Sequence, residues 1–234
     1  MSADPAKINA AMAALDFVRE GMTIGLGTGS TAAHFVRLLG ERVRQGLVVL
    51  GVPTSEATRS LAEAAGVPLV DLARVTQIHL AVDGADEIDP DMNLIKGGGG
   101  AHLREKIIAA AAEQFIVIGD ESKPVKMLGA FPLPIEVAPF GFTITAGRIY
   151  EALRETGCEG HDVTLRGGAD PALPFITDNG NFILDAECRS IPDPHDLAGA
   201  LKSIPGVVEH GLFLDMTHIV IIGNEEGAEI WEVE

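Results

Sequence analysis

The sequence predicts an α/β fold: a Rossmann-like domain with a parallel sheet, and an inserted smaller α+β domain. Short apolar runs alternate with amphipathic helical segments over roughly the first half of the chain, which is the pattern of parallel strands joined by crossover helices. The segment Phe131-Pro-Leu-Pro134 then interrupts that pattern. The elements after it follow the order βαββαβ, which is the order of a ferredoxin-like domain.

Composition limits the function classes. Hydrophobic residues make up 47% and charged residues 22% of the 234 residues, as in a folded globular protein. The net charge of −17 argues against a nucleic-acid partner but leaves a small anionic ligand possible. We see no signal-peptide core and no apolar run of membrane-spanning length. Two distant cysteines, Cys158 and Cys188, fit a reducing compartment, so we expect a cytoplasmic protein without membrane contact.

The first domain is expected to begin with a helix that starts at Pro5, is capped by Ser2 or Asp4, and ends at Gly21. Its predicted apolar stripe is Ile8, Met12, Leu15 and Val18. Strands are then expected at 23–27, 47–52, 68–72, 78–82 and 115–119. Helices are expected through 33–43 and at 55–65 and 101–114.

The second domain is expected to contain strands at 135–138, 161–165, 182–187 and 207–212, with helices at 143–156 and 194–204. An Asn-Gly turn signal precedes the strand at 182. A last buried strand, 219–223, would rejoin the first domain. The predicted bounds are therefore 1–130 with 213–234 for the Rossmann-like catalytic domain, and 131–212 for the smaller one.

A glycine-rich turn joins the first strand to the second helix. The frame from Gly27 to Ala32 matches a dinucleotide fingerprint only superficially, because no acidic residue ends the following strand. Backbone N–H groups and hydroxyls at a helix N-terminus instead suit a phosphate group. The residues concerned are Thr28, Gly29, Ser30 and Thr31. A tight turn with capping hydroxyls is the alternative.

An acidic loop, a glycine loop and a helix follow the strand that ends at Val82. Asp83 comes directly after this strand, where open α/β sheets bind ligands. Lys96 precedes four glycines, Gly97, Gly98, Gly99 and Gly100, whose N–H groups can approach a ligand closely. Glu105 lies early in the next helix. Together these groups suit proton transfer next to a carbonyl.

Simpler interpretations remain open for these residues. Taken singly, Asp86, Glu87, Asp89 and Asp91 fit a solvated turn. Their spacing fails a calcium loop of the EF-hand type, and Lys96 nearby disfavours magnesium, so we expect no metal. Lys7 and Lys123 are candidate phosphate counter-charges, and Lys126 is expected to be solvated.

The motifs together resemble those of the A-type ribose-5-phosphate isomerases, from the first helix to the last strand. They are Gly27-Thr-Gly-Ser-Thr31, Asp83-Gly-Ala-Asp-Glu87, Lys96-Gly-Gly-Gly99, Arg104-Glu-Lys106, Ser122-Lys123, Phe131-Pro-Leu-Pro-Ile-Glu-Val137, Thr177-Asp-Asn-Gly180 and Pro205-Gly-Val207. One departure is Pro139-Phe-Gly-Phe142, where small or basic residues are expected, so a phosphate contact from that segment is not assigned.

The resemblance implies interconversion of ribose 5-phosphate and ribulose 5-phosphate in the pentose phosphate pathway, without cofactor or metal, by a homodimer or homotetramer. It implies that Glu105 is the base and that Asp83, Asp86 and Lys96 surround the sugar. It places Thr28, Ser30, Thr31 and Lys123 near the phosphate. Two other functions remain possible: a sugar-phosphate deaminase, and a non-catalytic sugar-phosphate sensor.

Overall fold

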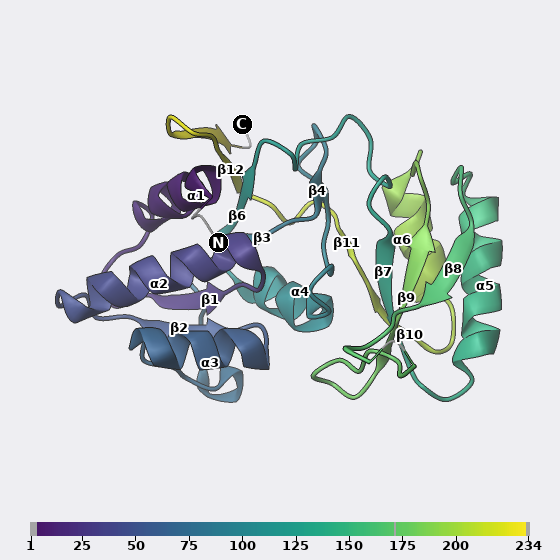
Figure 1. The fold of residues 1–234 in the computed structure, drawn as a ribbon, viewed down its shortest axis with the longest axis horizontal. Helices are drawn as coiled ribbons and strands as arrows, with labels where there is room; N and C mark the ends of the chain where they lie inside the picture. The colour runs from purple at the N-terminus through teal and green to yellow at the C-terminus, as the bar shows by residue number, and fades with distance from the viewer. Residues whose placement is uncertain (1–3, 171, 233–234) are drawn as a thin grey trace. The chain divides into compact units, whose positions relative to one another are not determined.

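The computed structural model describes residues 4–170 and 172–232 (Figure 1). The chain forms two compact units, and it passes between them four times. Unit 1 comprises Met1–Ala85, Arg104–Lys123 and Met216–Glu234. Unit 2 comprises Asp86–Leu103 and Pro124–Asp215.

Unit 1 is built on a six-stranded sheet in the order β13-β12-β6-β3-β1-β2. Five strands are parallel, and β13 joins the edge antiparallel to β12. The strands are β1 (Thr23–Leu26), β2 (Leu50–Pro53), β3 (Leu80–Gly84), β6 (Phe115–Asp120), β12 (Ile219–Gly223) and β13 (Ala228–Glu232). The predicted parallel sheet is therefore confirmed. The strand order reverses between β1 and β3, which makes the carboxyl ends of these two strands the topological switch point.

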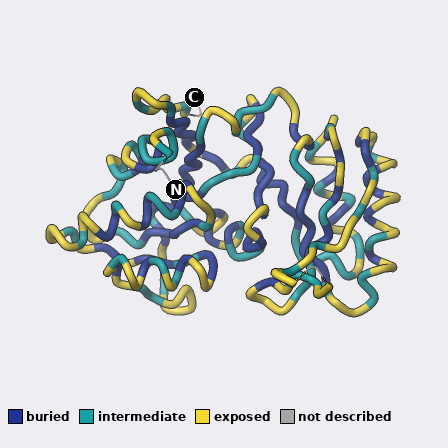
Figure 2. The backbone as a smooth tube through the Cα atoms, viewed as in Figure 1, coloured by how far each residue is buried: buried dark blue, intermediate teal, exposed yellow. Residues whose placement is uncertain are grey.

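Helices of unit 1 cover this sheet. They are α1 (Pro5–Leu15), α2 (Ser30–Arg44), α3 (Glu56–Ala65), the 3-10 turn Leu72–Arg74, and α4 (His102–Ala111), whose first two residues belong to unit 2. Burial is continuous along β3, β6 and β12 (Figure 2), because apolar residues of these strands are covered on both faces. Phe35, Val36 and Leu39 of α2 pack into the core on one side.

Helix α1 differs from its prediction at its cap, at its buried face and at its end, which is Leu15 where Gly21 was expected. The Asp4 side chain makes no capping hydrogen bond, so that expectation was wrong, and Ser2 lies outside the described residues. Met12 of the predicted stripe is 53% exposed. Ala10 and Ala14 are buried instead, because α1 lies so close to β12 that a Cβ at Gly223 would overlap the Ala6 carbonyl oxygen. Small residues are therefore required on this face.

Unit 2 contains a four-stranded antiparallel sheet in the order β10-β7-β9-β8. Its elements are β7 (Leu133–Val137), α5 (Phe142–Glu155), β8 (Asp162–Leu165), β9 (Phe182–Glu187), α6 (Pro194–Lys202) and β10 (Val207–His210). The βαββαβ order and this pairing confirm the predicted ferredoxin-like arrangement. Leu153, Leu184 and Leu197 are among the residues of its core.

A second, three-stranded sheet of unit 2 was not predicted. It pairs β11 (Leu212–Phe213), β5 (Leu94–Ile95) and β4 (Glu87–Ile88). The strand expected at 207–212 is therefore split between two sheets. The pairing of β11 with β5 also explains why residues 86–103 and 213–215 group with unit 2 here, unlike in the predicted domain bounds. Residues 124–130, predicted for the first domain, lie in unit 2 as well. The bounds of the functional domains stay a prediction.

Two further differences concern unit 1. The strand expected at 68–72 was wrong: Leu69 forms only an isolated bridge with Gly51, and a 3-10 turn begins at Leu72. The edge strand β13 was not predicted, because its residues are mostly exposed and carry no apolar alternation strong enough to detect.

The close approach of α1 to β12 gives a stability prediction. Because the new Cβ would overlap the backbone of Ala6, we expect Gly223→Ala to lower the free energy of unfolding by about 1–3 kcal/mol. Gly227→Ala is the matched control, since nothing lies within 4 Å of a Cβ there. Urea unfolding of both variants measures the difference, and equal stability would contradict the tight packing.

Candidate active site

The switch point of unit 1 brings Thr28 and Asp83 together. Asp83 is the penultimate residue of β3 and is 3% exposed. Its Oδ1 accepts hydrogen bonds from the backbone N–H of Thr28 at 3.0 Å and of Gly84 at 2.7 Å. A Cβ at Gly27 would overlap the Asp83 carboxylate, so glycine is required at that position. The predicted Asp83 and the predicted glycine turn are thus parts of one structure.

Four hydroxyl groups hold the turn after β1 in place. The Thr28 Oγ1 lies 2.7 Å from that of Thr54 and 3.1 Å from that of Thr58, and it donates to Ser55 Oγ at 2.8 Å. Thr58 Oγ1 also donates to the Gly27 carbonyl at 2.9 Å. Sequence reasoning missed this cluster, although Thr54 and Ser55 directly follow β2. The Thr28 hydroxyl has a structural role, whatever it contributes to a ligand.

Helix α2 begins at Ser30, directly after this turn. Its N-cap is Gly29, which has a φ of 107° and contributes no side-chain cap. Ser30 is exposed, whereas Thr31 is 6% exposed. The first N–H groups of a helix lack partners within the helix and carry the positive end of its dipole, so this end is suited to an anion.

The two candidate counter-charges lie near the end of β6. Lys7 Nζ is 3.3 Å from an oxygen of Asp4 and 3.9 Å from one of Asp120. Burial raises the pKa of Asp120, but hydrogen bonds from the Ser122 hydroxyl and N–H bring it below its ordinary value overall. The positive charges of Lys123 and Lys7 act in the same direction. Both lysines therefore lie close enough to Asp120 for their charges to act on its carboxyl.

Glu105 lies in the first turn of α4 and is 4% exposed. Ile108 lies one turn later on the same helix face, and it packs so closely on β1 that a Cβ at Gly25 would overlap it. The face that carries Glu105 is therefore the face that meets the sheet. Its neighbour Arg104 donates to Glu56 at 2.8 Å, and this bond lowers the pKa of the exposed Glu56 carboxyl.

The glycine loop and Asp86 lie in unit 2. Asp86 Oδ2 accepts a hydrogen bond from Gly98 N–H at 2.8 Å. Gly97 and Gly100 have φ values of 111° and 77°, which L side chains rarely adopt. A Cβ at Gly97 would also press on the His102 ring at 2.7 Å. Gly98 and Gly99 are exposed. The predicted loop therefore requires its glycines for conformation as well as for access.

Lys96 is 2% exposed, which is unusual for a lysine. Its Nζ lies 5.3 Å from the centre of the Phe213 ring, a cation–π contact, and its N–H donates to the Gly211 carbonyl at 2.9 Å. The buried ammonium is thus held beside the residues of β11.

Sequence reasoning missed Arg166, which follows β8. Its Nη1 donates to the carbonyls of Gly97 at 2.8 Å and Gly98 at 3.2 Å. Its Nε donates to Asp185 at 2.8 Å, and its Nη2 forms a second bond to the same carboxylate. No local motif marks Arg166, because its partners lie far along the chain.

The solvated-turn interpretation was wrong for two acidic residues. Glu87 is 4% exposed and accepts hydrogen bonds from the N–H of Gly129 at 2.7 Å and of Phe131 at 2.6 Å. Asp89 accepts from the N–H of Asn93 at 2.8 Å. Only Asp91 is exposed as expected. Glu87 and Asp89 therefore organise loops of unit 2.

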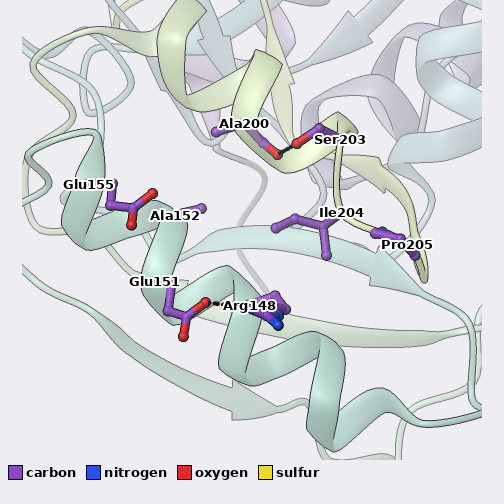
Figure 3. Close-up of a pocket in the computed structure, with 8 residues that line it drawn as sticks. All are labelled: Arg148, Glu151, Ala152, Glu155, Ala200, Ser203, Ile204 and Pro205. Atoms are coloured by element: carbon purple, nitrogen blue, oxygen red, sulfur yellow. Dashed lines mark hydrogen bonds and ion pairs between the residues drawn. The ribbon is translucent and has the colours of Figure 1, made fainter.

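The segment 139–142 belongs to the helix start of unit 2. Phe142 begins α5 and packs edge-on against Phe182, with ring centres 5.5 Å apart, whereas Phe140 is 96% exposed. A hollow of about 330 Å³ lies between α5 and α6 (Figure 3). The residues that line it are Arg148, Glu151, Ala152, Glu155, Ala200, Ser203, Ile204 and Pro205, none of which is a predicted site residue.

In the described part of the chain, no three His, Cys, Asp or Glu residues are grouped as metal ligands. Within residues 4–170 and 172–232, helices long and apolar enough to cross a membrane are also absent.

Comparison with known proteins decides the family. The family model of ribose 5-phosphate isomerase A (phosphoriboisomerase A) matches residues 50–227. The ribose-5-phosphate isomerase A of Nitrobacter hamburgensis is 56% identical over 232 residues, or 99% of either chain. That of Maricaulis maris is 53% identical over 233 residues, or 100% of both chains. This chain belongs to the ribose 5-phosphate isomerase A family.

Solved structures show that the fold extends over almost the whole chain. A ribose 5-phosphate isomerase A from Methanocaldococcus jannaschii is 43% identical, with a TM-score of 0.88 over 97% of this chain and 98% of that one. A D-ribose-5-phosphate isomerase in complex with phospho-erythronic acid is 46% identical, with a TM-score of 0.90 over 97% of both chains. The predicted two-part fold of the isomerase family is thereby confirmed.

Proposed function

We propose that this chain interconverts D-ribose 5-phosphate and D-ribulose 5-phosphate through an enediolate, as a step of the non-oxidative pentose phosphate pathway. The observation that carries this proposal is an identity of 52–56% to ribose-5-phosphate isomerase A proteins over nearly the full chain. The family motifs quoted from the sequence lie in that aligned length. A deaminase or a sensor has no comparable support.

Glu105 is proposed as the base that removes the proton from C2 and returns it to C1. The reaction needs one positioned carboxylate. A buried residue on a packed helix face satisfies this need, because the helix restricts the carboxylate to few positions.

Lys96 and the N–H groups of the glycine loop are proposed to stabilise the developing oxyanion. Asp83 and Asp86 are proposed to bind the sugar hydroxyls. The chemistry uses no metal and no organic cofactor.

The phosphate is proposed to bind at the N-terminus of α2. Gly29, Ser30 and Thr31 would contribute N–H groups and hydroxyls. Thr28 would line the same turn, while its own N–H donates to Asp83. Gly97, Gly98 and Gly99 are proposed to contact the sugar end of the substrate. Lys7 and Lys123 are proposed as counter-charges.

The direct test is incubation with ribose 5-phosphate, with ketose formation followed in a buffer that contains a chelator. We expect full activity. A loss of activity that added magnesium restores would contradict the metal-free chemistry. Release of ammonia from an amino sugar phosphate would identify a deaminase. Binding of ribose 5-phosphate without turnover would identify a sensor.

We also propose that the protein is a homodimer or homotetramer in the cytoplasm. Its two cysteines are unpaired, as a reducing compartment favours. Light scattering of the purified protein should give a mass two or four times that of the chain, and a monomeric mass would contradict the proposed assembly.

Glu105→Gln tests the base. The amide keeps the size of the side chain but cannot accept the proton, so kcat should fall by about 10²–10⁴-fold. In heavy water the parent should incorporate deuterium at carbon, and the variant should not. Glu63→Gln, on the exposed surface of α3, is the matched control. Near-normal turnover in Glu105→Gln would move the base elsewhere, with Asp83 the next candidate.

Thr31→Val tests the phosphate anchor. Loss of a hydrogen bond to a charged group should raise KM by about 10–100-fold with little effect on kcat, because the anchor binds ground and transition states alike. Thr164→Val, on the exposed strand β8, is the control. An unchanged KM in Thr31→Val would leave the turn a structural feature only.

A further inference from the structure

The Arg166 guanidinium has contacts that a surface arginine does not need. Its side chain is 15% exposed. One nitrogen, Nη1, donates to two successive carbonyls of the glycine loop, those of Gly97 and Gly98. The other two nitrogens bind the Asp185 carboxylate as a pair. All these residues lie in unit 2.

These bonds determine where the loop N–H groups point. The peptide bonds are trans, so the C=O of one residue and the N–H of the next point in opposite directions. Arg166 binds the Gly97 carbonyl, and Asp86 binds the Gly98 N–H on the opposite side of the same peptide. Binding of the Gly98 carbonyl likewise turns the Gly99 N–H away from Arg166.

The loop itself fixes only part of this geometry: the Gly100 N–H donates to the Gly97 carbonyl at 2.9 Å, and no bond within the loop holds the Gly98 carbonyl among the described contacts. Successive glycines have the widest choice of backbone conformation, and they have no side chains that could pack. Gly98 and Gly99 are also exposed, so neighbouring residues do not bury them. An oxyanion-binding site, however, requires donors that are oriented before the charge develops. The orienting group must therefore come from another segment.

Arg166 is itself held in place. The paired bonds to Asp185, on β9, set the plane of the guanidinium. The guanidinium carbon lies 6.0 Å from the centre of the Phe175 ring. The Phe175 ring also lies against the loop, because a Cβ at Gly100 would approach two of its ring carbons to 2.5 Å. Arg166 and Phe175 thus contact the glycine loop directly, and Asp185 holds Arg166 in position.

We infer that Arg166 is a positioning residue for the isomerase reaction: by holding the Gly98 carbonyl, it directs the Gly99 N–H at the oxyanion of the enediolate. The Gly98 and Gly100 N–H groups already donate to Asp86 and to the Gly97 carbonyl. Asp185 acts through Arg166 by fixing its orientation. This inference rests on the proposed function, in which an N–H group of the glycine loop stabilises the oxyanion. It assigns a role in the reaction to a residue outside the family motifs quoted above.

The test compares Arg166→Gln, Arg166→Lys and Asp185→Asn by their kcat and KM for ribose 5-phosphate. Loss of a directly placed oxyanion donor costs about 10²–10³ in kcat; because Arg166 acts one step away, we expect Arg166→Gln to lose roughly 10–100-fold. KM should stay within about threefold, because the phosphate anchor is unchanged. Arg166→Lys keeps the charge without the fork geometry and should be intermediate.

Arg148→Gln is the matched control, since Arg148 forms an exposed ion pair with Glu151 on α5. A kcat of Arg166→Gln equal to that of Arg148→Gln would overturn the inference, as would a raised KM with normal kcat. Equal losses in Arg166→Gln and Arg166→Lys would also overturn it. If circular dichroism shows Arg166→Gln to be unfolded, Asp185→Asn decides, and unchanged kcat there overturns the inference. An inactive parent would instead refute the proposed function.

Discussion

The geometry at the switch point of the parallel sheet depends on the close contact between the Gly27 backbone and Asp83. Strands β1 and β3 are neighbours where the strand order reverses, and a side chain at Gly27 would occupy the place of the Asp83 carboxylate. Because that place is free, Asp83 can accept the Thr28 N–H, which fixes the turn that begins α2. A larger residue at position 27 would separate the strands and remove the bond that aims the helix N-terminus.

The acidic run after β3 uses its carboxylates in the same way at four positions. Asp83 accepts the N–H of Thr28, Asp86 that of Gly98, Glu87 those of Gly129 and Phe131, and Asp89 that of Asn93. Each carboxylate thus holds a different loop by its backbone. A charged acceptor forms stronger bonds than a neutral one. These four carboxylates therefore have a structural role, whereas Asp91 is exposed. Asp83 and Asp86, which are proposed to touch the substrate, are also loop anchors.

Features made by residues close together in the sequence could be predicted, whereas contacts between distant residues could not. The alternation of strands and helices, the glycine turn at Gly27 and the position of Asp83 are local patterns, so the sequence was sufficient to predict them. Strands of two residues, such as β4 and β5, are too short to show a period. Arg166 is 69 positions from Gly97, and the hydroxyl partners of Thr28 reach it only through the packing of β1 against β2. Such contacts arise from tertiary structure and leave no motif.

A net charge of −17 is compatible with the proposed phosphate site. Charges on the surface are screened beyond about 8 Å at physiological ionic strength, so nearby groups determine the potential at a binding site. The carboxylates of the acidic run point at backbone N–H groups, whose dipoles offset part of their charge. The proposed phosphate site has a helix N-terminus. The proposed counter-charges, Lys7 and Lys123, lie close enough to Asp120 to lower the pKa of that carboxyl. The overall acidity then governs solubility, while local donors govern recognition.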